Sequence, residues 1–159
     1  MLGDRSTFFS IIDRTITSIE RSAVTSVGSY VFNGCTSLSS VSFPNCTSVG
    51  SYAFQDCTSL TAVNLPTCTT LNQNAFNSCT SLSSISLPAC TLIGLLAFNN
   101  CTSFSTIYVG TSNCTLASSA FRSTGITPTS GSIYVPSSYV ADYKTANHWS
   151  TYSTQIIGY

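Results

Sequence analysis

A unit of 22 residues, clearest in Val49 to Thr70 (VGSYAFQDCTSLTAVNLPTCTT), recurs through most of the chain and constrains its fold more than any other feature. One copy precedes it at Val27 to Ser48, and two follow, at Leu71 to Leu92 and from Ile93 onward with a small insertion. Self-similarity at a period of roughly 20 to 50 residues is typical of a solenoid, in which each coil buries its apolar face only against its neighbours. The repeat therefore predicts stacked coils that share one continuous core.

One half of the unit predicts a short β-strand with one wet face. Leu38, Val41 and Phe43 are expected to point inward, while Ser40 and Ser42 point outward. Parallel stacking of the copies would pair backbone groups from coil to coil. A proline ends this strand in three units, because proline cannot donate to a ladder; the positions are Pro44, Pro66 and Pro88.

The other half of the unit carries a glycine column and an Ala-Phe pair. The column reads Gly28, Gly50, Asn72 and Gly94, and glycine replaced only by asparagine predicts a left-handed backbone conformation. Ala53-Phe54 and its copies are expected to begin a short helical turn that places an aromatic ring in the core.

Seven cysteines stand 11 residues apart, half a unit, and an eighth follows after 13 (Cys35, Cys46, Cys57, Cys68, Cys79, Cys90, Cys101 and Cys114). A disulfide framework is one interpretation. A zinc site would need a CxxC-type pair, which is absent. The favoured interpretation is two internal columns of free thiols, since cysteine behaves as a small buried apolar residue and neighbouring side chains in a ladder point the same way.

The two ends of the chain depart from the repeat. Residues 4 to 14 predict a short helix, capped by Asp4 or Ser6, within an N-terminal helical cap at 1–15. About five coils are expected over 16–135. The segment 136–159 predicts a C-terminal cap, with a strand just before it, a helix from about Pro136 to Ala146, and a last strand at Ile156-Ile157.

The runs AFQDCTSLTAVNLP (53 to 66) and AFNSCTSLSSISLP (75 to 88) resemble the BspA-like leucine-rich repeats of bacterial surface proteins and related phage-borne genes. The resemblance covers about residues 16 to 136. It implies a leucine-rich-repeat solenoid, mainly β, with stacked short parallel strands, short helical turns and helical end caps. Cysteine at 46, 68 and 90 departs from the family pattern, where valine or serine is common.

Charge excludes several function classes. The formal net charge is zero with five basic and five acidic residues, so the chain has no electrostatic footprint for nucleic acid or an anionic membrane. Between Arg21 and Arg122 the only charged residue is Asp56. No apolar run approaches the roughly 18 residues of a membrane span, and the first residues lack the pattern of a secretion signal.

No catalytic, metal or cofactor site is predicted. The single histidine, His148, is offset by six residues from Asp142 and does not share a helix face with it. The repeats hold no histidine, lysine or arginine to activate a thiol. Three Asn-Cys-Thr sequences match the glycosylation sequon and are interpreted as products of the repeat template, at Asn45, Asn100 and Asn113.

The outward strand positions form two columns of mostly small polar side chains. The candidate ligand-binding residues lie in one of them, as Ser42, Asn64, Ser86, Tyr108 and Tyr134. The two tyrosines are its only large anchors, and aromatic anchors favour protein or sugar contacts. The alternative is that they only cover the last coils. Leu95 and Leu96, on the opposite side, predict either an exposed apolar spot or local packing.

The leading hypothesis is a non-enzymatic binding or adhesion module at a cell or virion surface that recognises a host or cell-surface protein or glycan. The expected location is extracellular, and a phage tail tip fits the missing signal. The alternative is a structural fibre or phage tail component, since the uncharged surface allows copies to self-associate.

Overall fold

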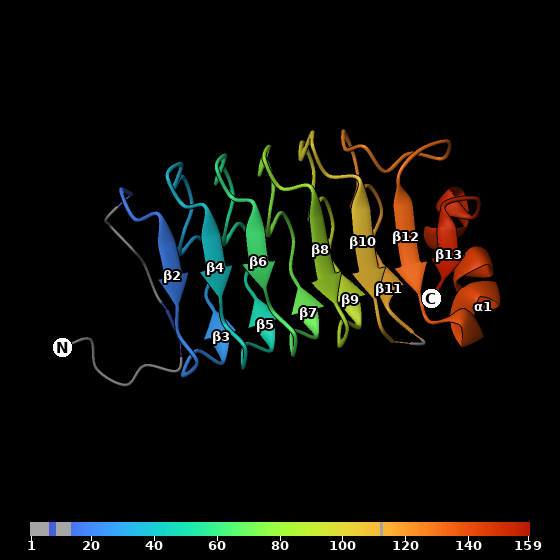
Figure 1. Ribbon diagram of the computed structural model, residues 1–159, viewed down its shortest axis with the longest axis horizontal. Coiled ribbons are helices and arrows are strands. Elements are labelled where there is room, and N and C mark those ends of the chain that lie inside the picture. Colours follow the sequence, from blue (N-terminus) through green and yellow to red (C-terminus); the bar gives the residue numbers. More distant parts are fainter. Residues whose placement is uncertain (1–6, 9–13, 112) are drawn as a thin grey trace.

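The computed structural model describes residues 7–8, 14–111 and 113–159, with side chains from Arg14 onward. The chain forms a row of stacked coils with strands on two sides (Figure 1). We call the longer strands the front column: β2 (Ser18–Glu20), β4 (Ser40–Ser42), β6 (Ala62–Asn64), β8 (Ser84–Leu87), β10 (Thr106–Val109), β12 (Ser132–Val135) and β13 (Ile156–Gly158). The back column holds two-residue strands: β1 (Thr7–Phe8), β3 (Ser26–Val27), β5 (Ser48–Val49), β7 (Thr70–Leu71), β9 (Leu92–Ile93) and β11 (Thr115–Leu116).

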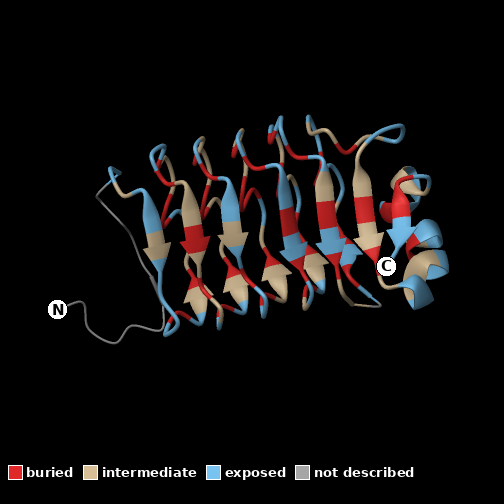
Figure 2. Ribbon diagram, viewed as in Figure 1, coloured by how far each residue is buried: buried red, intermediate tan, exposed pale blue. Residues whose placement is uncertain are grey.

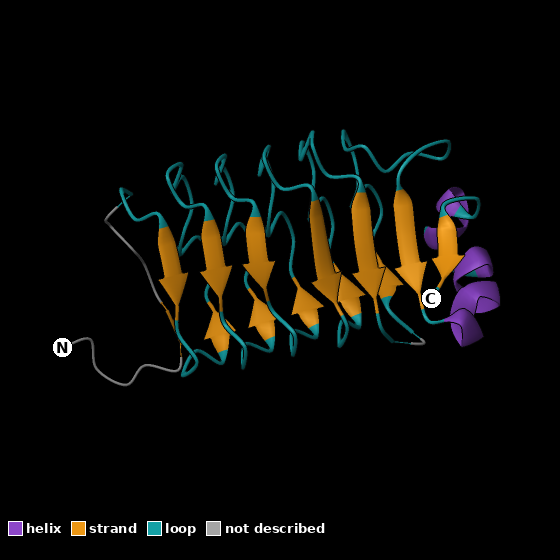
Figure 3. Cartoon of the chain, in the orientation of Figure 1, coloured by secondary structure: helices purple, strands orange, loops and turns teal. Residues whose placement is uncertain are grey.

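All ladders between these strands are parallel, and each repeat position pairs with its copy in the next coil. Val41 is opposite Val63, and Ile107 lies between Ile85 and Ile133. The mainly β solenoid with little helix is the fold that the sequence predicts (Figure 3).

The front column is divided where the back column is continuous. The back strands form one six-stranded sheet, but the front strands form a three-stranded sheet (β2-β4-β6) and a four-stranded sheet (β8-β10-β12-β13). Within each of these two sheets, backbone hydrogen bonds also join the residues just before the strands. The Thr61 N–H donates to the Ser39 carbonyl at 2.9 Å, and the Ser105 N–H donates to the Ser83 carbonyl at 3.0 Å. No ladder joins β6 to β8 among the described residues. Back-column pairing, core packing and turn hydrogen bonds, such as that from the Phe54 N–H to the Ala75 carbonyl at 2.8 Å, hold the two halves together.

Buried residues lie on both columns of strands and on the turns between them (Figure 2). A ladder of phenylalanine rings lies in this core. Phe54 lies 5.0 Å from both Phe32 and Phe76 between ring centroids, and Phe76 lies 5.6 Å from Phe98, all with interplanar angles of 5°. These rings are fully buried. The predicted inward placement of the aromatic residue in each unit is therefore correct.

The predicted left-handed conformation of the glycine column is wrong. Left-handed residues instead lie two positions after the column (Tyr30, Tyr52, Asn74, Leu96 and Ser119) and four positions after that (Gly34, Asp56, Ser78, Asn100 and Ser123). The glycines instead lie close to the backbone of the preceding coil. A Cβ on Gly50 would lie 2.6 Å from backbone atoms of Gly28 and Ser29, and one on Gly94 would lie 2.7 Å from the backbone of Asn72.

The predicted N-terminal helix is wrong at Thr7–Phe8, which form β1 and pair in parallel with β3. The physical reason is that the outer edge of β3 offers unpaired backbone groups, which a further strand satisfies and a helix cannot. The remaining residues of that prediction before Arg14 (4–6 and 9–13) lie outside the described residues.

The segment after β12 folds across the last coil. It contains two 3₁₀ turns, at Ser137–Tyr139 and Trp149–Tyr152, with α1 (Val140–Thr145) between them, and ends in β13. The predicted strand, helix and last strand are all present. The buried Trp149 indole N–H donates to the Cys114 carbonyl at 2.7 Å, and the Tyr143 hydroxyl donates to the Thr111 carbonyl at 2.7 Å. Within the described ranges, no helix is both long and apolar enough to cross a membrane.

Candidate functional site

The outward side chains of the front column, which we call the front face, bring the candidate residues into one row. In register, Ser42 is opposite Asn64, and Tyr108 lies between Ser86 and Tyr134. The row is interrupted only between Asn64 and Ser86, where β6 and β8 do not pair. Asn64, Ser86 and Tyr108 are exposed, while Ser42 and Tyr134 are half-buried.

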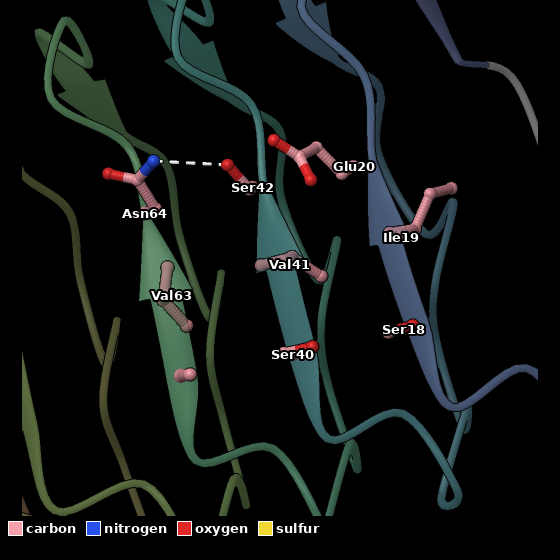
Figure 4. Close-up of a pocket in the computed structure, with 9 residues that line it drawn as sticks. Ser18, Ile19, Glu20, Ser40, Val41, Ser42, Val63 and Asn64 are labelled. Carbon is pink, nitrogen blue, oxygen red and sulfur yellow. Dashed lines mark hydrogen bonds between the residues drawn. The ribbon is translucent and has the colours of Figure 1, made fainter.

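The N-terminal half of the front face is a shallow depression with a mixed lining. It has a volume of about 400 Å³ and lies over β2, β4 and β6. The apolar side chains Ile19, Val41 and Val63 line it together with the small and polar residues on either side of them in each strand. The Asn64 amide donates to the Ser42 hydroxyl at 3.0 Å, so the side chains of adjacent coils are tied together (Figure 4).

The C-terminal half of the front face is aromatic. The rings of Tyr108 and Tyr134 stack at 4.6 Å with an interplanar angle of 11°. Tyr159 meets Tyr108 edge-on at 6.2 Å. Ile157 follows Tyr134 in the same row. We call Tyr108, Tyr134, Ile157 and Tyr159 the aromatic cluster; Tyr108, Ile157 and Tyr159 are 39%, 41% and 60% exposed.

Sequence reasoning missed Ile157 and Tyr159 as members of this surface. The signal was available, because both residues follow the buried Ile156 at alternating positions. Side chains alternate between the two faces of a strand, so once Ile156 points inward, Ile157 and Tyr159 point outward. Their exposure adds apolar and aromatic area to this end of the front face.

The front face is almost free of charge. Across both outward columns the only charged residue is Glu20, at the N-terminal end of the row. Its neighbours along the solenoid are hydroxyl, amide and methyl groups. The face can therefore supply hydrogen bonds and apolar contact, but no ionic attraction beyond that end.

The cysteines form two buried columns of thiols that are not in disulfides, as the sequence predicts. In one column Cys57, Cys79 and Cys101 donate to a phenylalanine carbonyl of the preceding coil, as Cys79 does to Phe54 at 3.1 Å. In the other, Cys46, Cys68 and Cys90 donate to the carbonyl two residues later, as Cys46 does to Ser48 at 3.2 Å. The sequence analysis identified burial but missed these hydrogen bonds, which let cysteine satisfy turn carbonyls without adding volume.

Burial makes the repeat thiols poor nucleophiles. Removal from water, with a smaller contribution from Cys35, raises the pKa of Cys57 from 9.0 to about 12. Burial, followed by the influence of Cys46, likewise raises the pKa of Cys68 to about 12. Because the thiolate is the reactive form, these side chains are inert at neutral pH.

Cys114 departs from its column. Its thiol lies 3.9 Å from the Thr115 carbonyl, a longer contact than its copies make, and the two-residue insertion before it accounts for the change of geometry. A hydrogen bond between Cys114 and Cys90 lowers the pKa of Cys90 and raises that of Cys114. Cys114 also lines a cavity of about 200 Å³ beside Asp142 and Asn147. His148 is exposed, and over the described parts of the chain no three His, Cys, Asp or Glu side chains cluster as a metal site would need.

A second exposed aromatic pair lies on the turns away from the front face. Tyr30 and Tyr52 stack at 4.8 Å with an interplanar angle of 8°, and Tyr30 is 57% exposed. In later coils the same position holds Asn74 and then Leu96. Leu95 is exposed and Leu96 half-buried, so the apolar spot expected there is limited to one side chain.

The chain was compared with protein families and with known proteins. The family model of the BspA type leucine rich repeat region matches residues 5–127 in six copies, where the sequence analysis counted about five coils over 16–135. No match was found among curated proteins.

Several solved structures share the fold. A leucine rich cell surface protein from Faecalibacterium prausnitzii matches with a TM-score of 0.65 and 25% identity over 82% of this chain and 38% of its own. A leucine-rich repeat protein from Bacteroides ovatus matches with a TM-score of 0.63 and 27% identity over 91% of this chain and 42% of its own.

The T. pallidum leucine rich repeat protein has a TM-score of 0.69 and 24% identity over 85% of this chain and 63% of its own, which shows likeness of fold alone. The chain thus spans less than two thirds of each of these relatives. From the match to most of its length, together with the solenoid geometry, the chain belongs to the BspA type leucine-rich repeat family.

Proposed function

We propose that this chain is a non-enzymatic binding module displayed on a cell or virion surface, and that the front face is its contact surface. The observation that carries the proposal is the aromatic cluster: the exposed Tyr108, Ile157 and Tyr159 lie together with the half-buried Tyr134 at one end of a face whose only charged side chain is Glu20. Aromatic residues that are solvent-exposed and surrounded by polar groups are the usual anchors of a binding surface.

Display at a surface is supported by the relatives. One solved structure with the same fold is described as a leucine rich cell surface protein, and this chain covers only 38% of it. The partner class proposed for the module is a host or cell-surface protein or glycan. A place at the tip of a phage tail belongs to the same proposal, with the solenoid exposed on a particle instead of a cell.

The test is a binding screen with two tyrosine-pair variants. The purified domain is applied to a glycan array and to a panel of purified cell-surface ectodomains. The Tyr108→Ser/Tyr134→Ser variant copies the serines of coils such as Ser86, and the control Tyr30→Asn/Tyr52→Asn copies Asn74 on the turns. We expect the first variant alone to lose binding. Binding unaffected by it, or no ligand in either screen, would refute the front face as the contact surface.

Self-association into a fibre is the second candidate function. It is favoured by the scarcity of charge, because between Arg21 and Arg122 only Asp56 is charged and copies would not repel one another. Sedimentation at increasing protein concentration tests it. Fibre formation predicts growing particles, and a constant monomer mass contradicts it.

A further inference from the structure

The ring of Tyr108 has one covered face and one open face. Tyr134 covers it on the side of β12, at a centroid distance of 4.6 Å. On the side of β8 its register partner is Ser86. Ser86 is exposed and too short to cover an aromatic ring. We call the open face of the Tyr108 ring the wall, and the surface of short side chains in front of it, on the side of β8, the floor.

Hydroxyl and amide groups supply the floor in front of this wall. Ser86 comes first, and Asn64 and Ser42 follow in the next two coils. The Asn64 amide uses one N–H to bind Ser42 at 3.0 Å, which leaves a carbonyl oxygen and a second N–H for a ligand. The shallow depression over β2, β4 and β6 lies beyond Asn64, and the apolar Ile19, Val41 and Val63 also line it (Figure 4).

The charge of the face matches a neutral ligand. Glu20, at the far end of the row, is its only charged side chain. An acidic or basic ligand would find no counter-ion near Tyr108 or along the serine floor. A protein partner would bury an apolar core against the face, and the floor in front of Tyr108 is polar.

We infer that the front face binds a neutral glycan chain, with one pyranose ring stacked on the open face of Tyr108 and its hydroxyl groups placed over Ser86. A pyranose ring combines a flat C–H face, which suits the wall, with hydroxyl edges, which suit the floor.

This inference rests on the proposed function, since it assigns the ligand class of the same face. Three variants test it by isothermal titration calorimetry with penta-N-acetylchitopentaose and cellopentaose as neutral probes and hyaluronan oligosaccharides as the charged comparison. Tyr108→Ser removes the wall. Ser86→Tyr places a tyrosine ring over the open face of Tyr108, as Tyr134 already covers the other face. Tyr52→Asn is the control on the turns, and the melting temperature of each variant reports its folding.

We expect at least one neutral probe to bind, hyaluronan oligosaccharides not to bind, and both Tyr108→Ser and Ser86→Tyr to weaken binding tenfold or more. Ser86→Tyr is decisive, because it enlarges the aromatic surface and would preserve binding of an apolar protein partner. If the sugars fail to bind while an ectodomain binds and tolerates Ser86→Tyr, the glycan inference is overturned and the proposed function stands. If the cluster instead mediates dimerisation, the inference fails. If neither sugars nor ectodomains bind, both fail.

Discussion

Replacing Phe76 by leucine tests whether stacked rings, rather than apolar volume alone, hold the middle of the array. The Phe76 ring lies 5.0 Å from Phe54 and 5.6 Å from Phe98, nearly parallel to both, and is fully buried. Leucine keeps the position apolar but removes ring stacking on both sides. The site also lies beside the division between β6 and β8, where the front column gives no ladder to compensate.

The expected loss follows from these contacts. An aromatic pair contributes about 0.5–1.5 kcal/mol beyond its buried area, so losing two pairs costs about 1–3 kcal/mol. The smaller side chain adds a cavity term of about 1 kcal/mol. The free energy of unfolding should therefore fall by about 2–4 kcal/mol.

The matched control is Phe43→Leu, the same chemical change at a position where later coils already carry leucine. Leu65 and Leu87 occupy it and are buried. Phe43 meets Phe32 at 6.0 Å and 22°, a looser arrangement than the ladder contacts. We expect this substitution to cost about 1 kcal/mol.

Urea unfolding of the unsubstituted protein and both variants measures the two losses, and an unchanged slope against urea verifies that only stability differs. Phe76→Leu should cost clearly more than Phe43→Leu. Equal losses would refute the reasoning, because they would mean that the ladder contributes volume and no stacking.

Three further outcomes are expected. Burial raises the folded-state pKa of Cys57 and Cys68 from 9.0 to about 12, while these thiols ionise near 9.0 in the unfolded chain, so the stability they contribute is intact below pH 9.0 and declines above it. Above pH 9.0 each thiol lowers the free energy of unfolding by up to about 1.4 kcal/mol per pH unit. A melting temperature that stays constant between pH 9.0 and about 12 would contradict this. Gly50→Ala should destabilise by about 1–3 kcal/mol or more, because the added Cβ meets backbone at 2.6 Å; thermal denaturation measures it, and a neutral effect would refute the close-approach argument. Trp149→Phe should cost about 1–3 kcal/mol by leaving the Cys114 carbonyl unsatisfied, and limited proteolysis should then cleave the C-terminal segment faster, whereas unchanged cleavage would count against the bond.

The repeat itself made the coil geometry predictable. A position such as Val41 has the same neighbours in every coil, so its period identifies its side of the strand without long-range information. The row of candidate residues followed from that alternation. Tyr159 was missed because it lies outside the repeat, where no second copy identifies its direction.

The glycine column shows why conformation was harder to infer than position. Glycine would recur at this position of the repeat whether it was needed for a left-handed backbone or for contact with the next coil. The structure distinguishes the two explanations, because a Cβ added to Gly50 would lie 2.6 Å from neighbouring backbone atoms. The first left-handed column was hidden because it holds mostly tyrosine, leucine and serine, residues that do not usually mark that conformation. The second column, with Gly34, Asp56 and Asn100, carried a signal that the sequence analysis missed. The division between β6 and β8 has no sequence signal that we can identify.

Hydrogen bonds between coils recur with the period of the repeat, as Thr69 bonds to Thr47 and Thr91 to Thr69. Donors and acceptors are therefore interchangeable among units. An in-frame duplication or deletion of one unit in the gene would leave the bonds at the new junction with partners of the same kind. The length of the front face becomes a trait that copy number can adjust, while the aromatic cluster stays at its C-terminal end. Selection could then change the length of the front face without altering the aromatic cluster.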